Sequence, residues 1–206
     1  MAIINRATKV LSLKIVYYGP AYAGKTTNLV QIHERVQTAS GDKGKLLSLA
    51  TSSDRTLYFD FLPIENVAIE GLKVKFQLYT VPSQVIYNTT RQLALRGVDG
   101  IVFVADSQFD KMQENVDSFQ NVSDNLKSLK LNLDEIPYVL QYNKRDLQNV
   151  APKEYMEFLL NNREVQVPSF TSVAQKGEGV METFEAVKTA LLKKFVQPPT
   201  APYYGP

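Results

Sequence analysis

The stretch Gly19-Pro20-Ala21-Tyr22-Ala23-Gly24-Lys25-Thr26 decides the fold of this chain, because it joins an apolar run to an amphipathic one. It fits the pattern G-x-x-x-x-G-K-[ST], a glycine-rich turn whose backbone N–H groups curl around phosphate oxygens. Residues 11–18 before it have the composition of a buried strand, and apolar side chains recur at helical spacing from Gly24 onward. The order strand, phosphate loop and helix predicts a unit that binds a nucleotide phosphate at the start of the helix.

Strand-like and helix-like segments alternate along the rest of the chain. Further strands are expected at residues 45–51, 73–80, 101–105, 138–142 and 168–172, and helices at 113–130 and 180–195. This alternation predicts an α/β fold with a mainly parallel sheet covered by helices on both faces. We expect one domain over residues 1–196, followed by a flexible, proline-rich tail at 197–206.

The composition excludes several classes of function. The chain has 206 residues, of which 44% are hydrophobic and 21% charged, and it contains no cysteine. Disulfide frameworks, zinc–thiolate sites, thiol catalysis and a cysteine-linked lipid anchor are therefore excluded. A net charge of +2 does not indicate binding to nucleic acid. The N-terminal residues do not resemble a signal peptide, and no apolar run is long enough to span a bilayer, so we expect a cytoplasmic protein.

A second motif, Asn143-Lys144-Arg145-Asp146, follows the expected strand 138–142. The Asp146 carboxylate can accept hydrogen bonds from both guanine N1–H and the 2-amino group, whereas adenine has neither donor and would leave the carboxylate unpaired. The methylene groups of Lys144 can lie along the base. Further on, the backbone N–H groups of Ser172, Val173 and Ala174 are candidates to contact guanine O6. The sequence therefore predicts a guanine nucleotide.

These motifs together resemble the small Ras-like GTPases, and more closely the MglA-like bacterial members of that group. The matching segments include residues 14–20, 55–63, 78–82, 96–106 and 143–146. The resemblance implies a three-layer P-loop fold with a six-stranded sheet, GTP or GDP and Mg²⁺ as ligands, and slow hydrolysis. It also implies an activating partner of the roadblock fold (MglB type), and downstream effectors of cell polarity and of gliding or type IV pilus motility. Partners would bring the protein to a cell pole.

The resemblance and the chemistry of the loop assign roles to individual residues. The candidate phosphate-binding residues are Gly19, Ala21, Ala23, Gly24, Lys25, Thr26 and Thr27. Lys25 would contact the β and γ phosphates, and the hydroxyls of Thr26 and Thr56 would hold Mg²⁺. Arg55 resembles an arginine that neutralises charge on the transferred phosphoryl group. Gln84 resembles the glutamine that orients the attacking water. As an alternative, Arg55 is a surface residue paired with Asp54.

Two positions depart from the usual pattern of small GTPases. Thr80 stands where most of them have an aspartate that anchors magnesium, and Ser83 stands where a glycine N–H faces the γ phosphate. These departures leave open a GTP-binding scaffold with negligible hydrolysis. A P-loop kinase or ATPase is a third hypothesis, against which the guanine motif argues. Residues 80–84 resemble the second switch segment of these GTPases. In the helix expected after this segment, Thr89, Thr90 and Arg91 lie where a partner would read the nucleotide state.

Overall fold

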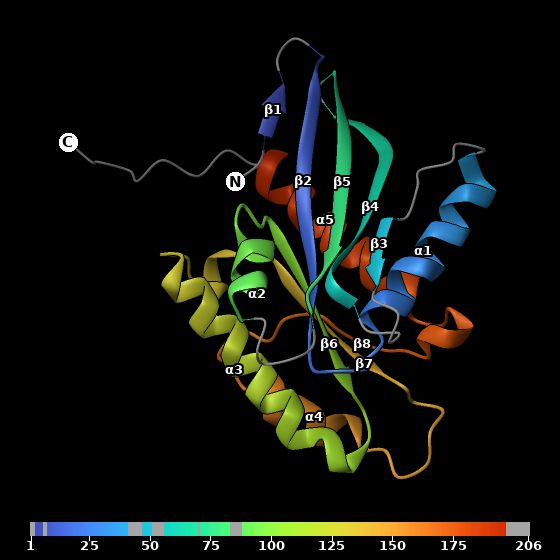
Figure 1. Ribbon diagram of the computed structural model, residues 1–206, viewed down its shortest axis with the longest axis vertical. Coiled ribbons are helices and arrows are strands. Elements are labelled where there is room, and N and C mark those ends of the chain that lie inside the picture. Colours follow the sequence, from blue (N-terminus) through green and yellow to red (C-terminus); the bar gives the residue numbers. More distant parts are fainter. Residues whose placement is uncertain are drawn as a thin grey trace.

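The computed structural model of the chain describes residues 3–5, 8–40, 47–50, 56–69, 71–82 and 88–196. Its strands are β1 (Ile3–Asn5), β2 (Val10–Tyr18), β3 (Leu47–Ala50), β4 (Thr56–Ile69), β5 (Leu72–Thr80), β6 (Gly100–Asp106), β7 (Tyr138–Asn143) and β8 (Ser169–Thr171). Its helices are α1 (Lys25–Ser40), α2 (Asn88–Leu95), α3 (Met112–Ser128), α4 (Lys153–Leu160) and α5 (Val180–Val196), with short 3-10 turns at Phe109–Lys111, Leu133–Glu135 and Ala174–Lys176. The predicted strand, loop and helix around the first motif are confirmed (Figure 1).

All these strands belong to one sheet in the order β3-β4-β5-β2-β6-β7-β8, with β1 paired to β2 outside this path. The five strands from β5 to β8 run parallel, whereas β4, β3 and β1 pair antiparallel with their neighbours. The expected mostly parallel sheet with helices on both faces is confirmed. The sheet has eight strands where six were expected, because β1 and β4 were not predicted.

The long strand β4 was missed because it contains a proline, and a residue without an N–H argues against a strand interior. In the structure Pro63 pairs with Gln77 of β5. Pro63 lies beyond Phe61 in β4. The pair Phe61 and Leu47 is the end of the β3–β4 ladder within the described residues. The helix α4 was also missed, since it has eight residues and buries only Met156 and Leu160 among them.

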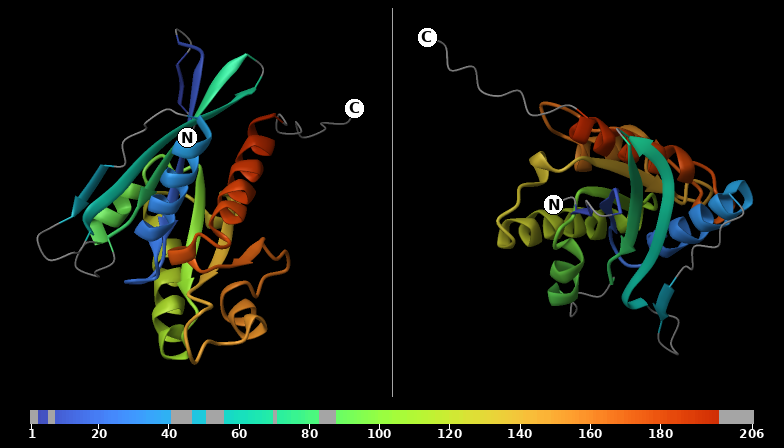
Figure 2. Two further views of the ribbon diagram at one scale, coloured as in Figure 1. Left: turned by 90° about the vertical axis from the view of Figure 1, so that its right-hand side faces the viewer. Right: turned by 90° about the horizontal axis from the view of Figure 1, so that it is seen from above.

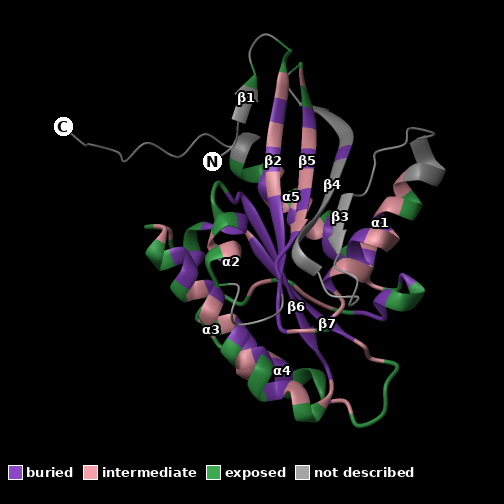
Figure 3. Cartoon of the chain, in the orientation of Figure 1, coloured by how far each residue is buried: buried purple, intermediate pink, exposed green. Residues whose placement is uncertain are grey.

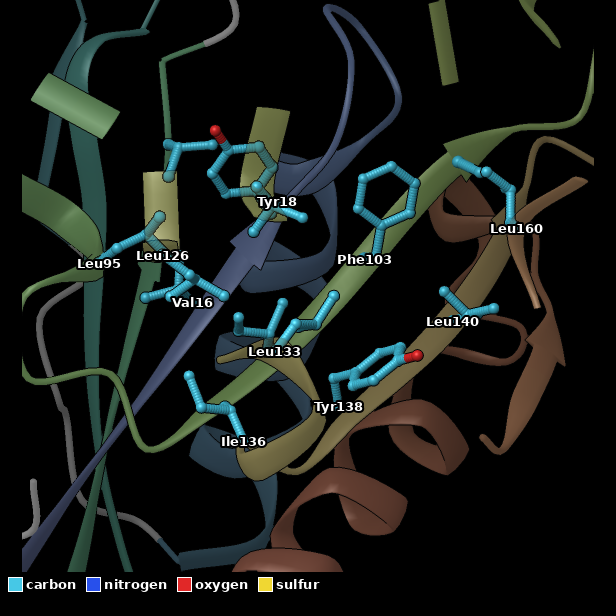
Figure 4. Close-up of a cluster of buried hydrophobic side chains, with 14 of the residues drawn as sticks. Val16, Tyr18, Leu95, Phe103, Leu126, Leu133, Ile136, Tyr138, Leu140 and Leu160 are labelled. Atoms are coloured by element: carbon cyan, nitrogen blue, oxygen red, sulfur yellow. The ribbon is translucent and has the colours of Figure 1, made fainter. Parts of the chain in front are cut away.

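Two hydrophobic cores lie on the two faces of the sheet, and the alternation of side chains along β2 divides them. Leu13 and Tyr17 point into the core under α1 and α5. Val16 and Tyr18 point into the core under α2, α3 and α4, where they lie near Phe103 of β6 (Figure 4). Figure 2 shows α3 and α5 on opposite faces of the sheet, and Figure 3 shows buried residues running through its central strands. The central strands are therefore packed on both faces.

No helix within the described residues is long and apolar enough to cross a membrane.

Candidate functional site

The loop between β2 and α1 needs glycine at two positions. Gly19 has a φ of +142°, and a Cβ there would lie 2.0 Å from the Val104 carbonyl oxygen. Gly24 has a φ of +100°, and a Cβ there would lie 2.2 Å from Nδ2 of Asn143. A side chain at either position would meet both a strained backbone and a close neighbour. The two glycines therefore let the loop lie directly against β6 and against the guanine motif.

The Lys25 side chain folds back onto the start of this loop. Its Nζ donates to the carbonyl oxygens of Gly19 at 3.0 Å and Pro20 at 2.6 Å, and the residue is only 5% exposed. A buried ammonium held by backbone carbonyls keeps a positive charge in the loop at the N-terminus of α1, where an anion is favoured. The loop thus has the curvature, the charge and the helix terminus that a phosphate requires.

Asn143 joins the three loops of the site through one buried side chain. Its Nδ2 donates to the Ala23 carbonyl at 2.8 Å. Its Oδ1 accepts from the Ser172 hydroxyl at 3.0 Å and from the Ala174 N–H at 2.9 Å. The residue is 2% exposed. Asn143 therefore sets the distance between the phosphate loop, the guanine motif and the loop after β8.

A pocket of about 260 Å³ opens where these three loops meet. Its lining residues are Tyr22, Gly24, Thr27, Asn143, Lys144, Asp146, Leu147, Val173, Ala174 and Gln175. It lies at the carboxyl ends of parallel strands, as is usual for ligand sites in such sheets. Asp146 brings a carboxylate to this pocket, and its Oδ2 lies 3.7 Å from the Lys176 ammonium at the surface. The pocket is thus lined by a carboxylate from the guanine motif as well as by residues of the phosphate loop.

Lys144 is held on one side of the pocket by two features. Its backbone is in the left-handed region, with a φ of +66°. Its ammonium donates to Oδ2 of Asp106 at 2.6 Å, and Asp106, at the end of β6, is 1% exposed. Breaking a buried ion pair leaves an uncompensated charge, so this contact fixes the side chain. Asp106 was not predicted as a site residue, although its place at the carboxyl end of a parallel strand is a signal that sequence reasoning can use.

The triplet after β8 makes bonds within the protein. The N–H groups of Ser172 and Val173 donate to the carbonyls of Tyr142 and Glu178, and that of Ala174 donates to Asn143. Val173 and Ala174 line the pocket, whereas Ser172 contributes through its hydroxyl on Asn143. The guanine contact expected for these N–H groups stays a prediction that requires one of them to change partner.

Several predicted residues are not brought to the pocket within the described part of the chain. Arg55, Ser83 and Gln84 lie outside the described residues, as does the tail from 197 to 206. Thr56 is the first residue of β4, and its side chain is outside the description. The described residues therefore include the candidate phosphate-binding and base-binding residues but not the candidate catalytic ones.

Arg91 differs from its expected role at the partner surface. It is 6% exposed, and it donates through Nε to the Pro82 carbonyl at 2.9 Å and through a terminal nitrogen to Oδ1 of Asn121 at 2.8 Å. Asn121 also accepts from the Tyr18 hydroxyl. Arg91 therefore fastens α2 to α3 and cannot be read by a partner in this conformation. Thr89 beside it is exposed.

The comparison with known proteins agrees with this geometry. The family model described as the Ras family matches residues 47–193, so the chain belongs to the Ras family of small GTPases. Within it the chain is MglA-like. It is 50% identical to the mutual gliding-motility protein MglA of Myxococcus xanthus, over 93% of this chain and 96% of that protein.

More distant relatives come from eukaryotes. The chain is 25% identical to the Ras-related protein Rab-13 of Canis lupus familiaris, over 88% of this chain and 80% of that protein. It is 28% identical to the Ras-related protein SEC4 of Saccharomyces cerevisiae, over 88% of this chain and 76% of that protein.

Proposed function

We propose that this protein is a guanine-nucleotide switch that binds GTP and GDP with Mg²⁺ and hydrolyses GTP slowly. The observation that carries the proposal is the pocket in which Asp146 and the phosphate loop are joined through Asn143. A carboxylate in the pocket, together with a phosphate loop that holds a buried ammonium, matches a guanine base and its phosphates. Membership of the Ras family supports the same assignment.

The residue types that the sequence supplies suit the metal as well as the nucleotide. The site donors are hydroxyls, and no group of three or more His, Cys, Asp or Glu side chains lies together in the described ranges. Thr26 and Thr56, with phosphate oxygens, would hold Mg²⁺, which would neutralise charge on the β and γ phosphates. Lys25 would bring its ammonium to the same phosphates, and Gln84 and Arg55 would act on the attacking water and on the transferred group.

The base-reading step is tested by isothermal titration with GDP, ADP and IDP. IDP lacks the 2-amino group and so removes one charge-assisted hydrogen bond to Asp146, which corresponds to an affinity loss of about 10- to 100-fold. ADP should bind far more weakly still. In Asp146→Asn the side chain offers one acceptor and one donor, so GDP affinity falls and the preference for GDP over IDP disappears. Equal binding of ADP and GDP to the wild-type protein would refute the proposal.

We also propose that a roadblock-fold partner of the MglB type accelerates hydrolysis and that the GTP form acts on effectors of polarity and motility at a cell pole. The support is the likeness to a protein named for gliding motility. Phosphate release with and without such a partner tests this: Arg55→Ala should keep GDP affinity and lower partner-stimulated turnover by roughly 10³. Unchanged stimulated turnover would remove Arg55 from the mechanism.

A second candidate function is a GTP-binding scaffold with negligible hydrolysis. It is favoured by Thr80, which is buried at the end of β5 and offers a hydroxyl where most small GTPases have a carboxylate. GTP binding without any phosphate release, whichever partner is present, would select this function.

A further inference from the structure

Tyr22 stands out in the phosphate loop because its backbone conformation is one that a bulky side chain disfavours. Its φ is +59°, in the left-handed region that glycine adopts readily and that bulky side chains disfavour. The loop uses glycine at its other two positive-φ positions, Gly19 and Gly24. At Tyr22 the chain instead carries a large aromatic residue in a conformation that destabilises the loop.

Packing in the core does not compensate for this conformation. Tyr22 is 70% exposed, whereas Tyr17 and Tyr18, only a few residues earlier, are fully buried. A strained residue that gains little from the fold is typical of a functional position, where the gain comes on binding a ligand. The exposed ring is thus surface that a ligand can cover.

The position of Tyr22 defines which part of a nucleotide would cover it. Tyr22 belongs to the phosphate loop and also lines the pocket to which Asp146 contributes from the guanine motif. In a nucleotide the sugar joins the base to the phosphates. Tyr22, Gly24 and Thr27 line the pocket from this part of the chain, and of these three Tyr22 carries the large, exposed side chain that can reach the sugar. Lys144, held by Asp106, lines the same pocket from another loop.

We propose that Tyr22 is a nucleotide-contacting residue whose ring covers the sugar of a bound guanine nucleotide and slows its release. This inference rests on the proposed guanine-nucleotide function. The apolar face of an aromatic ring removes the C–H groups of a pentose from water, and the contact must break before the nucleotide leaves. Tyr22 thereby sets how long the switch stays loaded.

The test measures the rate at which tritium-labelled GDP is released. Tritium leaves the shape of the nucleotide unchanged, whereas a bulky reporter group on the sugar would disturb its contact with Tyr22. In Tyr22→Gly the backbone suits glycine, so the variant folds at least as well as the wild type, and we expect release to be 5- to 20-fold faster. Tyr22→Phe keeps the ring and should release within two-fold of the wild-type rate. With an acyclic guanine diphosphate that lacks the pentose ring, Tyr22→Gly and wild type should bind equally.

Lys130→Gly is the matched control for relief of backbone strain. Lys130 also has a φ of +59° and is exposed, and it lies after α3, away from the lining residues of the pocket. This variant should gain thermal stability and release GDP at the wild-type rate. Unchanged or slower release in Tyr22→Gly, or an equal loss of the acyclic ligand, would overturn the inference alone. Failure of the wild type to prefer GDP over ADP would overturn the proposed function and this inference together.

Discussion

Replacing Asn143 with alanine tests whether one buried amide holds the pocket together. The change removes three hydrogen bonds, of 2.8, 2.9 and 3.0 Å, and leaves the Ala23 carbonyl, the Ala174 N–H and the Ser172 hydroxyl without this partner. These three residues are at most 3% exposed. A net cost of about 1 kcal/mol for each bond gives a loss of about 3 kcal/mol, since the adjacent pocket lets water reach the stranded groups.

Part of this loss appears in binding, because the ligand must then bring the three loops together itself. If it supplies the whole 3 kcal/mol, affinity for GDP falls by about 100-fold. In a domain of this size 3 kcal/mol also lowers Tm by about 6–12 °C. Asn143→Ala should therefore lose both stability and affinity.

Asn161→Ala is a matched control, because Asn161 is a buried asparagine with three hydrogen bonds away from the pocket. It is 1% exposed, donates to Glu157 at 2.6 Å and to the Val167 carbonyl at 3.0 Å, and accepts from the Val167 N–H at 3.0 Å. Its replacement should lower Tm by a similar amount. The pocket of the Asn161→Ala variant is unchanged, so the affinity of this variant for GDP should stay at the wild-type value.

Thermal unfolding over a range of GDP concentrations separates the two effects, since a ligand that binds only the folded state raises Tm once its concentration exceeds Kd. The curve of Asn161→Ala should lie parallel to and below that of the wild type. The curve of Asn143→Ala should begin to rise only at about 100-fold higher GDP. If both variants kept wild-type affinity, Asn143 would be a structural residue only, and the linkage of the loops would not control binding.

Three further predictions concern other parts of the fold. Gly24→Ala should lower GDP affinity at least 100-fold by titration calorimetry, because its Cβ would lie 2.2 Å from Nδ2 of Asn143 at a φ of +100°; wild-type affinity would show that the loop relaxes at no cost. Arg91→Met keeps the aliphatic stem but loses the bonds to the Pro82 carbonyl and Asn121, so urea unfolding should show a loss of at least about 2 kcal/mol, and an unchanged midpoint would contradict the anchoring role of Arg91. Burial raises the pKa of the Tyr17 and Tyr142 phenols, so the unfolded state releases their protons first and stability should fall as pH rises above about 10. Absorbance at 295 nm should show these phenols ionising only with unfolding; if they ionise in the folded protein, they are not sealed from solvent.

The parts of the fold that follow local patterns could be predicted from the sequence. The phosphate loop was found because its glycines and the strand and helix around it are contiguous, and Asp146 because its motif follows an apolar strand. The bridging role of Asn143 could not be found in this way, since its partner Ala23 is 120 residues away.

The remaining errors have physical causes in single residues. The proline in β4 locally disfavours a strand, yet Pro63 pairs with Gln77 of β5, and the guanidinium of Arg91 is buried although arginine is usually exposed. Asp106 follows the expected strand 101–105, and its ion pair with Lys144, 38 residues further on, ties it to the site. In each case a distant partner overrides the local preference.

The bond between Asn143 and Ala23, together with those to Ser172 and Ala174, also has a consequence for synthesis on the ribosome. The phosphate loop is translated early, but the residues that fix its position against the pocket come from the last third of the chain. Contacts between such distant segments form late in folding. A nascent chain that has not yet released β8 and Ala174 therefore cannot assemble the pocket, and nucleotide capture would come only near the end of synthesis.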